Sequence, residues 1–147
     1  MSSKIIGNAP EGFKNVAQKY GVDFARNLER LCRLETRHFM SSQWLKCGSA
    51  GMVAFDDKYP FGWSSLKEWV NKKGLNQDDF KTVYFSTTSD GKPRSYIRFP
   101  QTKYFVEFLA WFIQNKRNGN IYAWYSLDKE QQEQYKSKLD SITPKFI

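Results

Sequence analysis

One glutamate, Glu35, lies where the sequence predicts the apolar face of a long helix. Asp23 can cap this helix, which is expected to run to about Phe39. On a helical wheel of about 100° per residue, Glu35 falls roughly 20° from Leu28, inside the apolar stripe. Four arginines fall on the opposite face, which is interpreted as solvated: Arg26, Arg30, Arg33 and Arg37. The carboxylate is therefore predicted to lie away from the cations that could pair with it.

A carboxyl group in this position has the chemistry of a general acid. Desolvation favours the protonated form and raises the pKa. A carboxylic acid that stays protonated near neutral pH can donate its proton to a leaving group. The alternative is structural: Glu35, near a helix end, could instead accept a hydrogen bond from a buried loop amide.

The residues after Glu35 form a short segment rich in serine and glycine. The string ETRHFMSSQ is followed by GSAGM, and the stretch from Ser41 to Gly51 is predicted to be a loop. Glutamate at a helix end, followed by small residues and a Gly-Met pair, resembles the lysozyme superfamily. Lytic transglycosylases carry a comparable Glu-Ser run with a later Gly-Leu-Met. Small side chains would allow a sugar chain to approach the backbone beside Glu35.

A predicted hairpin strengthens this resemblance. TVYFSTT (82–88) and RSYIRF (94–99) read as two strands joined by a turn with an Asp-Gly signal. A hairpin that leads into a helix is similar to the β-N-acetylglucosaminidase branch of the superfamily, and the string YIRFPQ (96–101) stands at the corresponding place. The order of these motifs, from about Val22 to Pro144, looks like that of small phage-encoded cell-wall hydrolases.

The resemblance implies a peptidoglycan glycosidase that cleaves the β-1,4 glycan backbone, with Glu35 as the general acid. The bond cut stays open among muramidase, glucosaminidase and lytic transglycosylase. Asp56 or Asp57 is the candidate second carboxylate, and the alternative for both is a solvated turn before Pro60. The candidate substrate-binding residues are Ser41, Ser42, Gln43, Ser49, Gly51, Met52, Tyr59, Tyr96 and Tyr122.

The remaining pattern predicts an α+β protein that is mainly helical, with a lysozyme-like fold and one β-hairpin. The capping signals and periodicity predict helices over 10–20, 23–39, 64–73, 102–116 and 128–139, the last capped by Ser126. Asn118, Gly119 and Asn120 are expected to end the fourth of these. Among the aromatic residues, Phe61 and Trp63 are expected in the core. Residues 1–147 are expected to form a single catalytic domain.

Composition points to an anionic partner. The chain has 23 Lys and Arg against 15 Asp and Glu, a net charge of +8, which suits an acidic cell wall. No run of apolar residues is long enough to span a membrane, and no signal peptide is expected, because the first residues show no apolar run of that kind. We expect a monomeric phage product, released from the host cytoplasm or carried in the virion with other virion proteins, that acts on the wall in the periplasm.

Other chemistries find less support in the sequence. The spacing of Cys32, His38 and Cys47 fits no common zinc pattern, so no metal and no cofactor are expected. Tyr84 and Phe85 fall on opposite faces of a strand, which does not favour a stacking platform for nucleic acid, and no nucleic-acid partner is expected. The alternative function is a non-enzymatic virion or cell-wall-binding protein on the same fold, because the second carboxylate is poorly placed.

Overall fold

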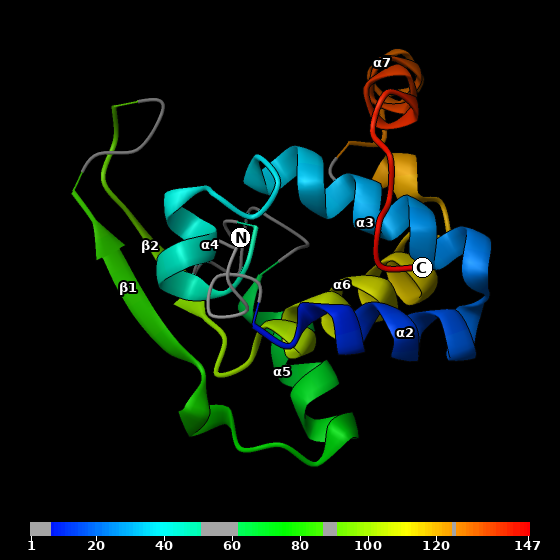
Figure 1. Cartoon of the computed structure of the whole chain (residues 1–147). Coiled ribbons are helices and arrows are strands. Elements are labelled where there is room, and N and C mark those ends of the chain that lie inside the picture. The colour runs from blue at the N-terminus through cyan, green and yellow to red at the C-terminus, as the bar shows by residue number, and fades with distance from the viewer. Residues whose placement is uncertain (1–6, 51–61, 87–90, 125) are drawn as a thin grey trace.

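The structure is a computed structural model, and it describes residues 7–50, 62–86, 91–124 and 126–147. It confirms a mainly helical chain with one two-stranded antiparallel hairpin in the middle. The elements in chain order (Figure 1) are α2 (Ala9–Tyr20), α3 (Val22–Thr36), α4 (Ser42–Cys47), α5 (Trp63–Lys73), η1 (Gln77–Asp79), β1 (Lys81–Phe85), β2 (Arg94–Arg98), α6 (Thr102–Lys116), η2 (Ile121–Ala123) and α7 (Lys129–Asp140).

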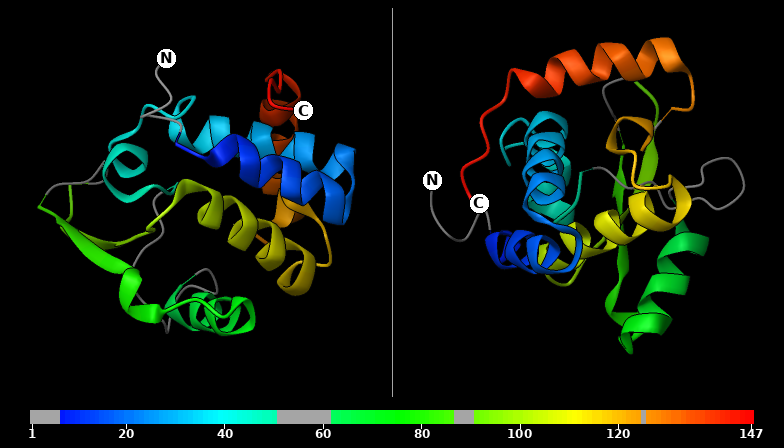
Figure 2. Two further views of the ribbon diagram at one scale, coloured as in Figure 1. Left: turned by 60° about the horizontal axis from the view of Figure 1, so that its bottom comes forward. Right: turned by 90° about the vertical axis from the view of Figure 1, so that its right-hand side faces the viewer.

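Helix α6 is the centre of the hydrophobic core. Its residues from Phe105 to Ile113 are buried except Glu107, so the helix is covered on nearly all sides, as its apolar sequence requires. α2 packs against both α6 and α3, α5 also contacts α6, and α7 contacts α3 on the side away from α5 (Figures 1 and 2). The core therefore separates α5 from α7.

The predicted helix over 10–20 is confirmed by α2, which begins one residue earlier at Ala9. Pro10 lies in its first turn, where the missing N–H costs nothing. Gly21 follows with φ 101°, a conformation that glycine adopts without strain. This turn brings α3 back alongside α2.

The second predicted helix is shorter than expected. α3 ends at Thr36, and the following residues Arg37, His38 and Phe39 all have positive φ. The Thr36 hydroxyl ends the helix: it donates to the Cys32 carbonyl at 2.6 Å and accepts from the Phe39 amide at 2.7 Å. A helix-period pattern does not reveal this competition from a side-chain hydroxyl.

The prediction of a loop from Ser41 to Gly51 was wrong for its first part, because α4 forms there. Ser41 is the N-cap, and its hydroxyl accepts a hydrogen bond from the Trp44 amide at 3.2 Å. Gly48 ends the helix in the left-handed conformation. Burial of Trp44 against Phe39 and Phe105 holds this short helix in place.

The predicted hairpin is confirmed, with β1 and β2 paired antiparallel. Val83 lies opposite Tyr96 and Phe85 lies opposite Arg94. The Tyr96 ring packs edge to face on Phe85 at 5.1 Å. Ser89 and Asp90 of the turn predicted at 89–92 lie outside the described residues.

The last helix begins one residue later than predicted and has a different cap. Asp128, not Ser126, is the N-cap of α7, and its carboxylate accepts from the Glu130 amide at 2.9 Å. The Ser126 hydroxyl, two residues earlier, instead accepts from the Asp128 amide at 3.1 Å. No helix within the described ranges is both long and apolar enough to cross a membrane.

Candidate active site

The last turn of α3 presents Glu35 to helix α7. The Tyr135 hydroxyl donates a hydrogen bond to Glu35 Oε2 at 2.7 Å, across one hundred residues of sequence. Both side chains are partly buried. Within the described ranges this is the one hydrogen bond that reaches the carboxyl group, and no ion pair does. Glu35 therefore keeps its second oxygen, Oε1, outside any hydrogen bond with described residues.

The surroundings of Glu35 favour its protonated form. Burial raises the pKa of the Glu35 carboxyl above its ordinary value of about 4.5, while the Tyr135 hydrogen bond and the nearby Lys138 ammonium act in the opposite direction. Glu35 also lies at the C-terminal end of α3, where the helix dipole disfavours a negative charge. Burial and the adjacent Glu35 raise the pKa of Tyr135, so this tyrosine remains a hydrogen-bond donor.

A strained turn follows directly after the glutamate. Arg37, His38 and Phe39 are three consecutive residues in the left-handed region, with φ of 49°, 57° and 68°. Residues other than glycine adopt this conformation at a cost of about 1–2 kcal/mol each. Packing of the buried Phe39 ring on Trp44 at 4.8 Å and Phe146 at 5.8 Å holds the turn. Such strain concentrates at functional sites, and it fixes the direction in which the chain leaves Glu35.

The described candidate substrate-binding residues do not share one environment. The Ser41 hydroxyl caps helix α4. Ser49 is fully buried, and its hydroxyl has no hydrogen-bond partner among the described residues. Ser42 is exposed and Gln43 is half-buried. Tyr96 is buried against Phe85 in the hairpin, and Tyr122 is half-buried on η2 with Lys136 over its ring at 5.9 Å.

Several predicted site residues lie outside the described residues. These are Gly51, Met52, Asp56, Asp57 and Tyr59, together with the predicted core residue Phe61. Trp63 is partly buried and packs against the core. The second carboxylate therefore stays a prediction.

A hollow of about 250 Å³ lies close to the segment after Glu35, between α4 and the end of β2. Lys46 and Arg98 give it a positive charge, and Gln101 and Thr102 add polar groups. A hollow with this charge suits an acidic polymer. Its lining residues differ from those predicted for the substrate.

The interpretation of the arginine face as solvated was wrong. Arg33 is buried, and Arg26 and Arg30 donate to the carbonyl oxygens of Ile147 and Ile142 at 2.5 and 2.9 Å. Of the four arginines, Arg37 is exposed. This face of α3 is covered by the C-terminal segment, which a helical wheel of α3 alone does not include.

Sequence reasoning missed two residues that matter here, Tyr135 and Glu29. Tyr135 and Leu139 are four residues apart on an otherwise polar helix, so their spacing marks the face that packs on α3. Glu29 is fully buried and accepts from the Arg33 guanidinium at 2.8 Å. Both depend on contacts across one hundred residues or more.

Both cysteines are buried free thiols. Burial raises the pKa of Cys47 to about 11 and raises that of Cys32 further, so both thiols stay protonated. Across the described part of the chain, no three His, Cys, Asp or Glu side chains lie close enough together to hold a metal ion.

Three comparisons with known proteins found no match to this chain. No family model, curated protein or solved structure matches this chain.

Proposed function

We propose that the protein is a peptidoglycan glycosidase with a lysozyme-like fold, in which Glu35 is the general acid. The observation that carries this proposal is the environment of the carboxyl group: it is withdrawn from water, its pKa is raised by burial, and one oxygen is free of hydrogen bonds from described residues. The resemblance of the ETRHFMSSQ and GSAGM strings to the superfamily supports the same assignment.

The hydrogen bond from Tyr135 suggests which oxygen would act. When Glu35 is protonated, Oε2 still accepts from the Tyr135 hydroxyl at 2.7 Å, so the proton is better placed on Oε1. Oε1 would then donate to the glycosidic oxygen of the leaving sugar. Tyr135 is a positioning residue in this scheme, because it acts through Glu35.

As the glycosidic bond breaks, positive charge develops at the anomeric carbon of the sugar that loses the leaving group. The transition state at this carbon is oxocarbenium-like. Asp56 or Asp57, a positioned water or the N-acetyl group of the substrate would stabilise that centre. Hydrolysis and anhydro-sugar formation both use a single acid to protonate the leaving oxygen.

The test is digestion of purified peptidoglycan by the wild type and by Glu35→Gln, with mass spectrometry of the fragments. Loss of the acid should reduce the rate by about 10² to 10⁴-fold. The matched control is Glu133→Gln, the same change at an exposed position of α7, which should retain activity. The reducing ends of the fragments identify the bond cut, and an anhydro-muramic end identifies a lytic transglycosylase.

Two results would contradict the proposal. Equal activity in Glu35→Gln and wild type would remove Glu35 from the chemistry. A folded wild type that binds peptidoglycan without releasing fragments would favour a non-enzymatic wall-binding or virion protein.

A further inference from the structure

Positive charge is concentrated in one part of the molecule, which we call the basic lobe: the turn after α3, helix α4 and the hairpin β1–β2 (Figure 1). Strand β2 contacts α4, and the Phe99 amide donates to the Cys47 carbonyl at 2.8 Å. The described residues of the lobe, 37–50, 81–86 and 91–101, include no Asp or Glu and six cations: Arg37, Lys46, Lys81, Lys92, Arg94 and Arg98. These residues account for most of the net charge of +8.

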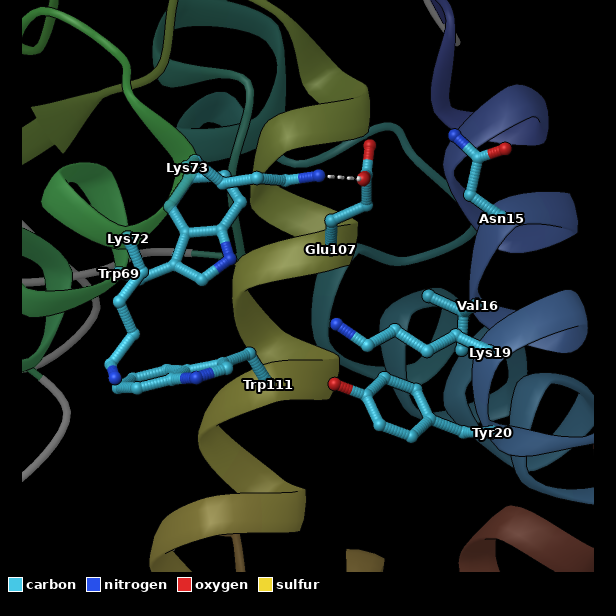
Figure 3. A pocket seen from close by; sticks show the side chains of 9 residues that line it. All are labelled: Asn15, Val16, Lys19, Tyr20, Trp69, Lys72, Lys73, Glu107 and Trp111. Atoms are coloured by element: carbon cyan, nitrogen blue, oxygen red, sulfur yellow. Dashed lines mark ion pairs between the residues drawn. The ribbon is translucent and has the colours of Figure 1, made fainter.

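The exposed cations of the basic lobe differ from a lysine in the recess between α2, α5 and α6. There Lys73 Nζ pairs with Glu107 Oε1 at 3.1 Å (Figure 3). In the lobe, Arg37, Lys46 and Arg98 are exposed, and none of them has an ion pair with any described residue. Their charge is therefore available to an anionic partner.

The hairpin register adds to this concentration of charge. Lys81 on β1 lies directly opposite Arg98 on β2. Like charges at directly opposed positions destabilise a strand pair, so an anionic surface against this face would relieve their repulsion. Arg98 and Lys46 also line the hollow between α4 and the end of β2, which brings cations from the helix and the hairpin to one place.

Two large apolar side chains are exposed beside these cations. Met40 is 48% and Leu45 is 53% exposed. They stand just before the N-cap Ser41 and four residues after it, and these two positions lie side by side at the start of a capped helix. Leu45 also lines the hollow that contains Lys46 and Arg98. A soluble polyanion has no use for an apolar pair, whereas the interface of a bilayer buries it.

We propose that the basic lobe docks on the surface of an anionic lipid bilayer. Met40 and Leu45 enter the interface. Arg37, Lys46 and Arg98 lie against the lipid phosphates, whose oxygens suit guanidinium and ammonium groups. Basic residues around exposed apolar side chains are the composition of segments that lie in a membrane interface. Each cation near such a surface strengthens binding about fivefold.

The test is co-sedimentation of the full chain with two kinds of vesicle. One is phosphatidylcholine alone, and the other is phosphatidylcholine mixed with phosphatidylglycerol. The wild type should bind the mixed vesicles about tenfold or more tightly. Added salt should weaken this binding, because it screens the charge of the lipid surface.

A first pair of variants tests the apolar contribution at constant charge. Met40→Gln with Leu45→Gln should weaken binding to the mixed vesicles about fivefold or more, because the interface no longer buries two apolar side chains. The matched control is Val22→Gln with Leu127→Gln, at positions that are 54% and 72% exposed outside the lobe. This control should bind like the wild type.

A second pair of variants tests where the charge acts. Arg37→Gln, Lys46→Gln and Arg98→Gln together should weaken binding to the mixed vesicles about tenfold or more. The matched control removes the same net charge by changing three exposed lysines outside the lobe to glutamine: Lys14, Lys67 and Lys129. Its binding should fall far less.

Spin-labelled lipid in the mixed vesicles locates the contact directly. It should broaden the methyl NMR signals of Met40 and Leu45 and leave those of Val22 and Leu127 sharp. The proposal fails if the neutral vesicles bind equally well, or if either control weakens binding as much as its partner. Unchanged binding in the Met40 and Leu45 variant would mean that the lobe recognises negative charge alone, as on a soluble polyanion, and would overturn the bilayer assignment.

The docking surface does not depend on the proposed glycosidase activity. Glu35 hydrogen-bonds to Tyr135 on α7, outside the basic lobe. Glu35→Gln should therefore bind vesicles like the wild type, and the apolar double variant should still release fragments from purified peptidoglycan, which contains no bilayer. The two proposals can thus fail separately.

Discussion

Helix α3 carries two carboxylates that are shielded from water and differ in their hydrogen-bond partners. Glu29 is fully buried and accepts from the Arg33 guanidinium and from the amides of Lys145 and Phe146, at 2.8, 2.5 and 2.9 Å. Glu35, less than two turns further along, accepts from the neutral hydroxyl of Tyr135. The cost of burying Glu29 is offset by a guanidinium and two backbone amides. Glu35 has no such charged or backbone donor among the described residues.

The difference separates a structural carboxylate from one suited to proton transfer. Charge-assisted and backbone hydrogen bonds offset the burial of a carboxylate, and through them Glu29 ties the C-terminal segment to α3. Glu35 has a raised pKa because burial outweighs its one hydrogen bond. The same helix thus carries an anchor and a candidate acid, and each can be altered alone.

The largest expected effect is loss of stability in Glu29→Gln. The substitution leaves the buried Arg33 guanidinium without its counter-charge. Removal of one partner of a buried ion pair costs about 3–5 kcal/mol. The measurement is urea unfolding at neutral pH, and the C-terminal segment should become more sensitive to proteolysis.

The control for this prediction is Glu11→Gln, which breaks the exposed ion pair with Lys103 at 3.4 Å. That change should cost less than about 1 kcal/mol. Similar losses in the two variants would mean that Arg33 is held mainly by its stacking on the rings of Phe39 and Phe146, at 5.0 and 4.8 Å.

A smaller effect is expected for Tyr135→Phe, which removes the one hydrogen bond between α7 and Glu35. Loss of this bond should cost about 1 kcal/mol of stability. Because the bond favours the ionised carboxylate, its removal should raise the pKa of Glu35 further, and the alkaline limb of the activity profile should move to higher pH. The measurements are carboxyl NMR titration of Glu35 and the pH dependence of peptidoglycan digestion.

Tyr104→Phe is the matched control for that variant. Tyr104 is half-buried on α6, and its ring contact with Trp69 survives the change to phenylalanine. An unshifted Glu35 titration in Tyr135→Phe would show that the tyrosine fills space beside the carboxyl group without tuning it.

Local sequence signals were enough to predict most helices and the hairpin. Caps and periodicity predicted α2, α5 and α6 closely, because Pro10, Gly74 and the apolar run to Ile113 act within one element. The helical-wheel pattern also predicted the partial burial of Glu35. The early end of α3 was missed, since it depends on the Thr36 hydroxyl competing for the backbone.

The partners of both carboxylates could not be read from local patterns. Glu29 meets Lys145 and Phe146 across more than 110 residues, and Glu35 meets Tyr135 across 100. A wheel shows which face of α3 a residue occupies, but it does not show which segment covers that face. The arginine face was misread for this reason: the C-terminal segment covers it.

The smallest expected effect is a pH-dependent gain of stability in Glu35→Gln. The folded-state pKa of Glu35 lies above its ordinary value of about 4.5, so between these two pKa values the folded protein binds more protons than the unfolded chain. The contribution of Glu35 to stability is therefore fully present below about pH 4.5 and declines as the pH rises through the folded-state pKa. Glutamine stays neutral and loses nothing over this range. Thermal unfolding at several pH values should show Glu35→Gln gaining on the wild type as the pH rises above about 4.5. Glu29→Gln should show the opposite sign at neutral pH, because glutamine there discards a charge that the fold uses. A constant difference between Glu35→Gln and wild type at all pH values would mean that folding does not shift the pKa of Glu35, and would remove the physical basis for its role as an acid.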